Sequence, residues 1–314
     1  MPDTSRDDAI HLVNVFTSDT GGGNLAPIVL RAEGLTDEDM RGLARKHERE
    51  SAFVLPPPPP SPEDGSDVDF QLRFFVPEHE MEMCGHATVG TAWAMHELGV
   101  SQKPELRFTT KSGPVRTVRR VERGDGLAAQ KVKVFVSQPK GTVEDVVDGE
   151  LVAEVLSVLG ITEAQLQQTT PRPVRNACTS RVKTTVALRS ADVLNSLRPD
   201  FSRVRDLCEK LGSTGLYPYA IVQPGSTNSA SGGQLVQVEA RQFPKASGYP
   251  EDAATGIAAA ALSYALAANG VLGVGQEAVV YQGRAMGYPS QINVLLEEDG
   301  CWVGGTCAWE HQST

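Results

Sequence analysis

The side chains best suited to chemistry stand at two short motifs, each followed by an apolar stretch. The first motif is Cys84-Gly85-His86-Ala87-Thr88, and the second is Glu251-Asp252-Ala253-Ala254-Thr255-Gly256. A thiol, an imidazole and a carboxylate, as in Cys84, His86 and Asp252, are groups that accept or donate protons. The unpaired N–H groups and the positive dipole end of a helix start favour an anion. We therefore expect Cys84, His86 and Asp252 to line a polar site that favours an anionic small molecule.

Glu50 is a further candidate, because it lies where the charged residues 47–49 give way to the apolar stretch 52–55. A carboxylate at such a border can be partly desolvated, which suits it to general acid–base catalysis. The same segment begins like the zinc motif H-E-x-x-H, but Ser51 stands where the second histidine would be. A zinc protease is therefore excluded.

Each of these residues also has a purely structural interpretation. His86 can be a hydrogen-bonded histidine at a helix start, and Asp252 can be an ordinary helix cap. Cys84 can be a small buried residue that packs the turn. The spacing alone leaves these alternatives open.

The two motifs must be positioned by the elements that follow them. In both cases a glycine-containing turn leads into a helix that is apolar on all sides, at 91–98 and at 258–266. Such helices are buried. We therefore expect two halves, each an α+β unit in which a sheet wraps around its own central helix. If the two helix starts face each other, they form a polar cleft between the halves.

Hydrophobic periodicity and turn signals predict the remaining elements. The predicted helices are 36–47, 150–159 and 201–211, and the predicted strands are 10–16, 26–31, 52–55, 70–76, 106–110, 115–121, 132–136, 182–188, 219–222, 235–240, 278–282, 291–296 and 301–308. The charged, glycine-containing segment 122–126 predicts the boundary between the halves. We therefore expect a first domain at 1–126, completed by the C-terminal strands 285–314, and a second domain at 127–284.

Two low-complexity segments lie in predicted loops. The glycines of 21–23 do not have the spacing of a dinucleotide or Walker loop, so a flexible turn is favoured over a phosphate site. The run Pro56–Pro60 is stiff and extended, and we expect a loop insertion between two strands rather than a ligand for proline-recognition domains.

Composition narrows the class of protein. The 314 residues are 40% hydrophobic, which supports a core in each of two domains, and the net charge is -10. That charge argues against a nucleic-acid or basic membrane-binding face. The N-terminal residues 1–8 lack the apolar run of a signal peptide, and the apolar run 257–268 is shorter than the ~20 residues of a membrane span. We expect a cytoplasmic protein that binds a small molecule.

The five cysteines are an odd number without a C-x-x-C spacing. Neither a disulfide framework nor a zinc site is predicted, and we expect reduced thiols.

Taken in order, several motifs resemble one known family, the PhzF-like phenazine-biosynthesis proteins of the diaminopimelate-epimerase-fold superfamily. The resemblance covers nearly the whole chain and rests on Gly23-Asn24, 50–54, 84–88, 109–113, 241–243, 251–256, 282–283 and 286–290.

The resemblance implies two similar halves, each a β-barrel-like sheet around a central helix, with the active site in the cleft between them. It implies a homodimeric isomerase of biosynthesis and secondary metabolism that uses neither metal nor cofactor. Glu50 matches the family's proton shuttle, and His86 and Asp252 match its other catalytic residues. The substrate-binding positions implied by the same motifs are Asn24, Ser51, Cys84, Gly85, Ala87, Thr255, Gly256 and Ile257.

The chain departs from the family pattern at three places. Ala253 replaces a proline, Ile257 replaces a serine, and Leu25 and Ala26 separate Asn24 from the proline that commonly follows it. The serine often helps to hold the substrate, so Ile257 favours a less polar substrate than the family's best-known one.

Three alternatives to the isomerase remain. An epimerase or lyase would use the same residues. A racemase with two thiols would need a second cysteine at the Asp252 motif, which is absent. A non-catalytic ligand-binding protein would have kept the fold without the chemistry. The sequence does not name the substrate.

Overall fold

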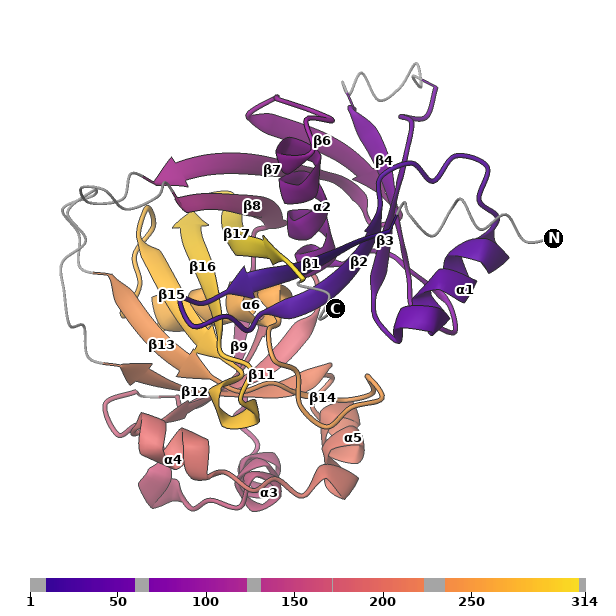
Figure 1. Cartoon of the computed structure of the whole chain (residues 1–314). Coiled ribbons are helices and arrows are strands. Elements are labelled where there is room, and N and C mark those ends of the chain that lie inside the picture. Colours follow the sequence, from indigo (N-terminus) through magenta and orange to yellow (C-terminus); the bar gives the residue numbers. More distant parts are fainter. Residues whose placement is uncertain (1–9, 60–67, 123–130, 171, 223–234, 311–314) are drawn as a thin grey trace. The chain divides into compact units, whose positions relative to one another are not determined.

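The computed structural model describes residues 10–59, 68–122, 131–170, 172–222 and 235–310. In these ranges the protein is a mixed α+β fold with six α-helices and a large sheet of parallel and antiparallel strands (Figure 1). It divides into two compact units. Unit 1 comprises Met1–Asp19, Gly23–Ser137 and Gly304–Thr314, and unit 2 comprises Thr20–Gly22 and Gln138–Val303.

Unit 1 is built on a continuous series of strand pairings. The strands are β1 (Ile10–Thr17), β2 (Asn24–Val29), β3 (Ser51–Leu55), β4 (Phe70–Phe75), β5 (Glu80–Met81), β6 (Glu105–Thr110), β7 (Gly113–Glu122), β8 (Lys131–Pro139) and β17 (Gly300–Trp309). β2 and β3 are parallel, as are β4 and β6, whereas β1–β2, β3–β4, β6–β7 and β7–β8 are antiparallel. Because β17 pairs with both β8 and β1, the series returns to its first strand.

The helix α2 (Gly85–Glu97) is buried in unit 1 and contacts β1, β2, β3 and β7. A Cβ atom added at Gly90 would lie 2.8 Å from a methyl carbon of Val15, so this glycine allows helix and strand to approach closely. The exposed helix α1 (Asp37–His47) begins with a capping box between Thr36 and Asp39.

Unit 2 has a second set of paired strands. They are β9 (Thr142–Asp145), β10 (Val174–Cys178), β11 (Val182–Leu188), β12 (Gly215–Val222), β13 (Val236–Ala240), β14 (Phe243–Pro244), β15 (Glu277–Gln282) and β16 (Ser290–Glu297). The order of pairing is β9–β10–β11–β12–β13–β15–β16, with β11–β12 and β13–β15 parallel, and β14 also pairs with β12.

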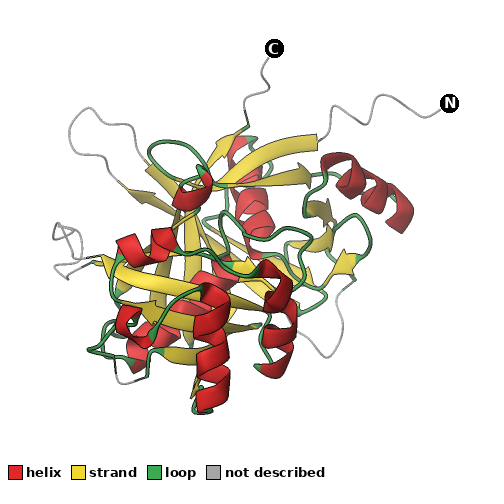
Figure 2. Ribbon diagram, turned by 90° about the horizontal axis from the view of Figure 1, so that it is seen from below, coloured by secondary structure: helices red, strands yellow, loops and turns green. Residues whose placement is uncertain are grey.

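Helices of two groups contact the strands of unit 2. Val186, Leu188, Leu216 and Ala220 join a core cluster with residues of α3 (Gly149–Leu159), α4 (Ala191–Ser196) and α5 (Phe201–Lys210). Figure 2, seen from the side of these helices, shows them in front of the strands. The buried helix α6 (Gly256–Ala268) contacts β9, β10, β11 and β16. Short 3₁₀ helices lie at Glu163–Gln165 and Arg284–Met286.

The sequence placed the N-termini of the buried helices near Gly85 and Gly256, which is where α2 and α6 begin. It was wrong about the residues that follow, because the glycine turns expected before 91 and 258 are part of the helices. Burial explains the difference, because backbone groups removed from water need partners and the helix supplies them. The buried hydroxyls of Thr88 and Thr91 donate to the carbonyls of Cys84 and Ala87 at 2.8 and 2.7 Å, so these polar groups are paired inside the core. The segments β5, β9, β10, β14 and α4 were not predicted.

The prolines that follow β3 lie in the connection to β4, as expected, and the structure describes Pro56–Pro59 as exposed and without regular structure. Pro60 and the acidic residues 61–67 lie outside the described residues, as do 1–8 and most of the predicted domain boundary 122–126. All five cysteines are free thiols.

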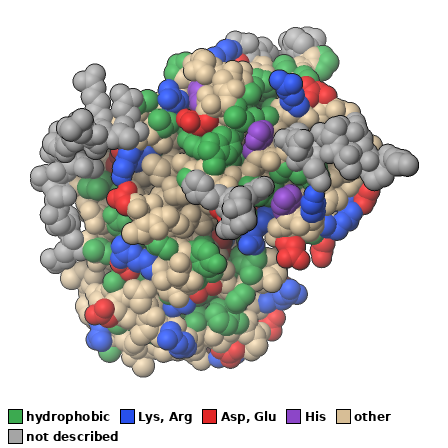
Figure 3. Space-filling view, in the orientation of Figure 1, with side chains coloured by type: hydrophobic (Ala, Val, Ile, Leu, Met, Phe, Trp, Pro, Cys, Tyr) green, Lys and Arg blue, Asp and Glu red, His purple; other side chains and the backbone are tan. Residues whose placement is uncertain are grey.

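The face of the molecule shown in Figure 3 does not carry the basic stripe that is typical of nucleic-acid-binding proteins. On the face shown in Figure 3, basic and acidic side chains are interspersed rather than gathered into a basic stripe. Within the described residues, no helix combines the length and the apolar character needed to cross a membrane.

Candidate active site

Unit 1 brings Glu50, His86 and Cys84 together. The Nε2 atom of His86 lies 3.9 Å from Oε2 of Glu50, and its Nδ1 atom lies 3.4 Å from the Sγ atom of Cys84. The imidazole thus stands between a carboxylate and a thiol. His86 and Cys84 are buried, whereas the Glu50 side chain keeps 23% of its surface exposed. A group that exchanges protons with a ligand needs this partial exposure.

Local structure explains how these side chains are placed. After α1, Glu48 takes a left-handed backbone conformation with φ of 51°, which caps the helix and reverses the chain. Glu50 then immediately precedes β3. Cys84 is the N-cap of α2, and His86 lies in the first turn of that helix.

The start of α2 lacks the usual side-chain cap. Neither a capping hydrogen bond from Cys84 nor an acidic residue in the first turn is present, in contrast to α1. The first N–H groups of the helix, which include those of Gly85 and Ala87, are therefore not satisfied by a cap and favour an anion there.

Two other predicted binding residues of unit 1 are placed by the sheet. Ser51 is buried at the start of β3, and its hydroxyl donates to the carbonyl of Arg49 at 3.2 Å. Asn24 is the first residue of β2, opposite Val15 in β1.

Unit 2 carries Asp252 in a dense hydrogen-bond network. The hydroxyl of Thr255 donates to Oδ2 of Asp252 at 2.5 Å, and the amide of Gln282 donates to the Asp252 carbonyl at 2.7 Å and to Thr255 Oγ1 at 3.1 Å. Tyr217 donates to Oε1 of Gln282 at 2.8 Å. The side chains of Thr255 and Gln282 therefore hold Asp252 directly, and Tyr217 holds Gln282.

Burial, and after it the charge of Asp252, raises the pKa of Tyr217. The phenol therefore remains protonated and serves as the donor at the end of this network. α6 begins directly after Thr255, again without a side-chain cap or an acidic residue in the first turn. Gly256 is buried, and Ile257 is partly exposed, so its side chain is not enclosed in the core.

A buried lysine lies in the electrostatic field of Asp252. Lys183 in β11 is 4% exposed, and burial lowers its pKa from 10.5 to about 8, although the negative charge of Asp252 acts in the opposite direction. Neither Lys183 nor Tyr217 nor Gln282 was predicted as a site residue. The signal for Lys183 was a single charged residue within the otherwise uncharged strand 182–188.

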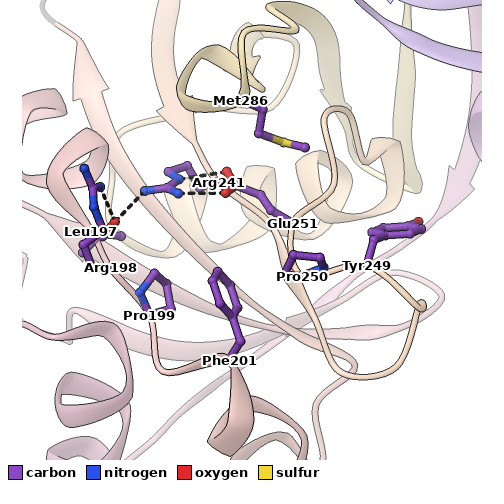
Figure 4. Close-up of a pocket in the computed structure, with 9 residues that line it drawn as sticks. All are labelled: Leu197, Arg198, Pro199, Phe201, Arg241, Tyr249, Pro250, Glu251 and Met286. Carbon is purple, nitrogen blue, oxygen red and sulfur yellow. Dashed lines mark hydrogen bonds and ion pairs between the residues drawn. The ribbon is translucent and has the colours of Figure 1, made fainter.

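The residue next to Asp252 forms a buried ion pair. Glu251 accepts two hydrogen bonds from the Arg241 guanidinium, at 2.8 and 2.7 Å, and both side chains are almost fully buried. Arg241 also donates to the carbonyls of Leu194 and Leu197 and lies over the ring of Phe243. The pair forms one wall of a cavity of about 490 Å³ (Figure 4). Next to this ion pair, Gln242, which follows Arg241, forms an isolated antiparallel backbone bridge with Asp252, which follows Glu251.

The structure thus gathers the predicted residues into two clusters. Glu50, Cys84, Gly85, His86 and Ala87 belong to unit 1, and Asp252, Thr255, Gly256 and Ile257 belong to unit 2. Among the described residues, no group of three or more His, Cys, Asp or Glu side chains is arranged to hold a metal ion.

Comparisons with known proteins identify relatives along the full length. Residues 13–307 match the model of the PhzC-PhzF family, described as phenazine biosynthesis-like protein. An uncharacterized isomerase of Deinococcus radiodurans is 32% identical over 310 residues, which cover 96% of this chain and 92% of that protein. The trans-2,3-dihydro-3-hydroxyanthranilate isomerase of Pseudomonas aeruginosa is 30% identical over 294 residues, covering 92% and 90%.

The solved structures agree about the fold. The crystal structure of a PhzF-family phenazine biosynthesis protein from Bacillus anthracis matches with a TM-score of 0.78 at 23% identity, over 96% of both chains. The predictions of the family and of an isomerase are confirmed. This chain belongs to the PhzC/PhzF phenazine biosynthesis-like family, whose curated relatives here are named isomerases.

Proposed function

We propose that this chain is a cofactor-independent isomerase that moves a proton on a small carboxylate- or carbonyl-bearing metabolite, with Glu50 as general base and then general acid. The observation that carries the proposal is the partly exposed Glu50 carboxylate, 3.9 Å from the His86 imidazole that Cys84 contacts on its other nitrogen. The partly exposed carboxylate can reach a ligand, and the neighbouring imidazole, which Cys84 contacts at Nδ1, can interact with the charge of Glu50. This supports a role for Glu50 as a proton shuttle.

The proposed chemistry balances without another reactant. Glu50 takes a proton from a C–H bond, and the electron pair of that bond moves toward the neighbouring carbonyl or carboxylate. The protonated Glu50 then returns the proton to another carbon, and the double bond shifts between the two positions. His86 and Asp252 are proposed to orient or polarise the substrate. The uncapped starts of α2 and α6 are proposed to favour its negative charge.

The finer features of the family also enter as proposals. Each unit is proposed to be a barrel-like sheet around its buried helix, α2 in unit 1 and α6 in unit 2. The division into 1–126 with 285–314 and 127–284, the homodimer, the cytoplasmic location and a role in secondary metabolism stay predictions. The Pseudomonas relative acts on a dihydro-hydroxyanthranilate, and a cyclic amino carboxylate is therefore our first candidate class of substrate.

The experiment has two stages. First, anionic cyclic and amino-acid metabolites are screened by thermal shift, and ligands that stabilise the protein are incubated with it in D2O. A shuttle that exchanges with solvent incorporates deuterium at the new C–H position, which NMR detects. Second, Glu50→Gln is compared with the wild type on the substrate found.

Glu50→Gln keeps the shape of the side chain but removes proton acceptance. We expect turnover to fall by ~100-fold or more while ligand affinity stays within about tenfold. Glu48→Gln, an exposed position in the same turn, is the matched control and should behave like the wild type. Near wild-type turnover by Glu50→Gln would exclude Glu50 as the base.

One alternative has a specific observation in its favour. Cys84 contacts His86, so a thiol is close to the imidazole and an epimerase could use it. The equivalent motif of unit 2 presents Asp252 instead of a second thiol, which disfavours the symmetric two-thiol reaction. A non-catalytic ligand-binding protein would show stabilisation by ligands in the screen but no deuterium incorporation with any of them.

A further inference from the structure

Two buried polar side chains of unit 2 lack the partners that their burial would demand. Lys183 is 4% exposed, and among the described residues its interactions are purely electrostatic, with Asp252, Arg181 and Cys208. Gln242 is 1% exposed, and neither its Oε1 nor its Nε2 has a hydrogen-bond partner among the described residues. Buried polar groups are normally paired, so these two require an explanation.

The strand register places both side chains near Asp252. Thr184 lies opposite Leu216, so Lys183 is beside Gly215, on the strand face opposite to that of Val186 and Leu188. The Gln242 amide lies over the same glycine, because a Cβ atom there would be 2.2 Å from its Nε2. Gln242 in turn faces Asp252 across a backbone bridge, with the Asp252 N–H donating to the Gln242 carbonyl at 3.1 Å.

Lys183 is not simply the ion-pair partner of Asp252. The negative charge of Asp252 acts on Lys183, yet the ammonium forms no ion pair with this carboxylate among the described residues. The Asp252 carboxylate is instead engaged by the Thr255 hydroxyl. An ammonium that is close enough to feel a carboxylate but does not contact it can accept a second anionic partner.

We propose that Lys183 and Gln242 hold the anionic group of the substrate beside Asp252. Lys183 neutralises the charge, and the Nε2 group of Gln242 donates a hydrogen bond to one of its oxygens. Ile257, partly exposed at the start of α6, has no donor to offer such a group. This inference rests on the proposed function and assigns the binding of the anion to two residues outside the α6 motif.

The proposal also explains the stability cost of Lys183. A buried ammonium without a close partner destabilises the folded state, and a role in binding an anion accounts for its presence here. The groups that face Lys183 do not remove this cost: Asp252 favours its charged form, Arg181 opposes it, and the Cys208 thiol is itself buried with a pKa raised to about 11. If Lys183 instead stabilised the fold, its replacement by an uncharged residue would lower the melting temperature.

The test uses the full chain and two probes that differ only in a carboxylate, anthranilate and aniline. Isothermal titration calorimetry at pH 7 gives the affinity of the wild type, Lys183→Met, Gln242→Leu and Lys210→Met for each probe. Lys210 is the matched control, because its exposed ammonium pairs with Glu154 on α3 in the same unit. Lys183→Gln provides the same comparison if Lys183→Met is insoluble.

We expect the wild type to bind anthranilate more tightly than aniline, and Lys183→Met to bind anthranilate about tenfold or more weakly than the wild type. Gln242→Leu should lose a smaller factor, and the affinity for aniline should be the same in all variants. Lys183→Met should also melt at the same temperature as the wild type or higher. Lys210→Met should match the wild type for both probes.

Equal anthranilate affinity in Lys183→Met and the wild type would overturn the proposal. No preference of the wild type for anthranilate over aniline would overturn it as well, and a lower melting temperature of Lys183→Met would assign Lys183 to the fold. Probe binding involves no proton transfer, so it can also be measured in Glu50→Gln. Full turnover by Glu50→Gln would refute the proposed role of Glu50, but it would not change what the anthranilate affinities say about Lys183.

Discussion

The ion pair between Arg241 and Glu251 is expected to hold Asp252 in place, and Glu251→Gln tests this. The side chains of Arg241 and Glu251 are 8% and 10% exposed, and two hydrogen bonds of 2.8 and 2.7 Å join them. Asp252 is the next residue in the chain, and its backbone bridges to Gln242, the neighbour of Arg241. The pair and the bridge thus fix the segment that enters α6 (Figure 4).

The size of the effect follows from what Glu251→Gln leaves behind. Removal of one partner of a buried ion pair costs about 3–5 kcal/mol, because the other charge remains buried. Gln keeps one acceptor oxygen, and Arg241 retains the carbonyls of Leu194 and Leu197 at 3.2 Å and the ring of Phe243. We therefore expect the lower end, about 3 kcal/mol. At about 2–4 °C per kcal/mol, the melting temperature should fall by roughly 6–12 °C.

Differential scanning calorimetry measures the change, and turnover at 25 °C measures its effect on the site. We expect turnover to fall by about tenfold, because a small misplacement of Asp252 weakens the alignment of the substrate. Glu154→Gln is the control in the same unit: Glu154 pairs with Lys210 at 2.9 Å, but Lys210 is 53% exposed. That pair should contribute less than about 1 kcal/mol.

A double variant separates the charge from the packing. Arg241→Met with Glu251→Leu removes both charges and should melt closer to the wild type than Glu251→Gln does. If Glu251→Gln melts within about 2 °C of the wild type, the uncompensated charge is not the cost that we infer. If the melting temperature falls as expected but turnover does not change, the ion pair stabilises unit 2 without positioning Asp252.

Three further predictions concern single side chains. Cys84→Ala removes the contact to Nδ1 of His86 at 3.4 Å, and we expect lower turnover with a shifted pH profile, which Cys84→Ser should largely restore. Ile257→Ser should shift preference toward more polar ligands without unfolding the protein, and unchanged relative affinities would contradict this. Because the pKa of Lys183 is lowered to about 8 in the folded state, the folded protein holds fewer protons than the unfolded chain between pH 8 and 10.5. The stability of the wild type relative to Lys183→Met should therefore rise across this range, by on the order of 3 kcal/mol in urea titrations, and a constant difference would refute it.

The sequence was most informative where the signal is local. The cap at Thr36 and the acidic first turn predicted the start of α1, and the hydrophobic pattern predicted β11 at 182–188 with the bounds that the structure has. Both signals arise within a few residues, so no knowledge of the rest of the fold is needed. The first residues of α2 and α6 were expected to form turns but are helical, because burial, which depends on tertiary packing, favours a helix there.

The site was predicted only where motifs carried it. Cys84 and His86 stand two residues apart, so their contact is local, whereas the approach of Glu50 to His86 depends on how β3 and α2 pack. Glu50 and His86 were predicted to share a site only because the chain resembles a known family. The network of Tyr217 with Gln282 joins residues 65 positions apart, and the electrostatic effect of Asp252 on Lys183 acts between residues 69 positions apart (252 − 183). No periodicity in the sequence reports such pairings, so these residues were missed.

The difference between the two clusters gives a physical reason to choose Glu50 rather than Asp252 as the base. A base needs a lone pair that is free to accept a substrate proton. The Asp252 carboxylate already accepts the Thr255 hydroxyl at 2.5 Å, and its backbone carbonyl accepts the Gln282 amide, so a proton taken by Asp252 would disrupt a network that extends to Tyr217. Among the described residues, the Glu50 carboxylate has His86 at 3.9 Å as its charged neighbour and keeps an exposed surface. Protonation of Glu50 therefore breaks less of the structure, and Asp252 is better suited to hold a substrate in a fixed orientation.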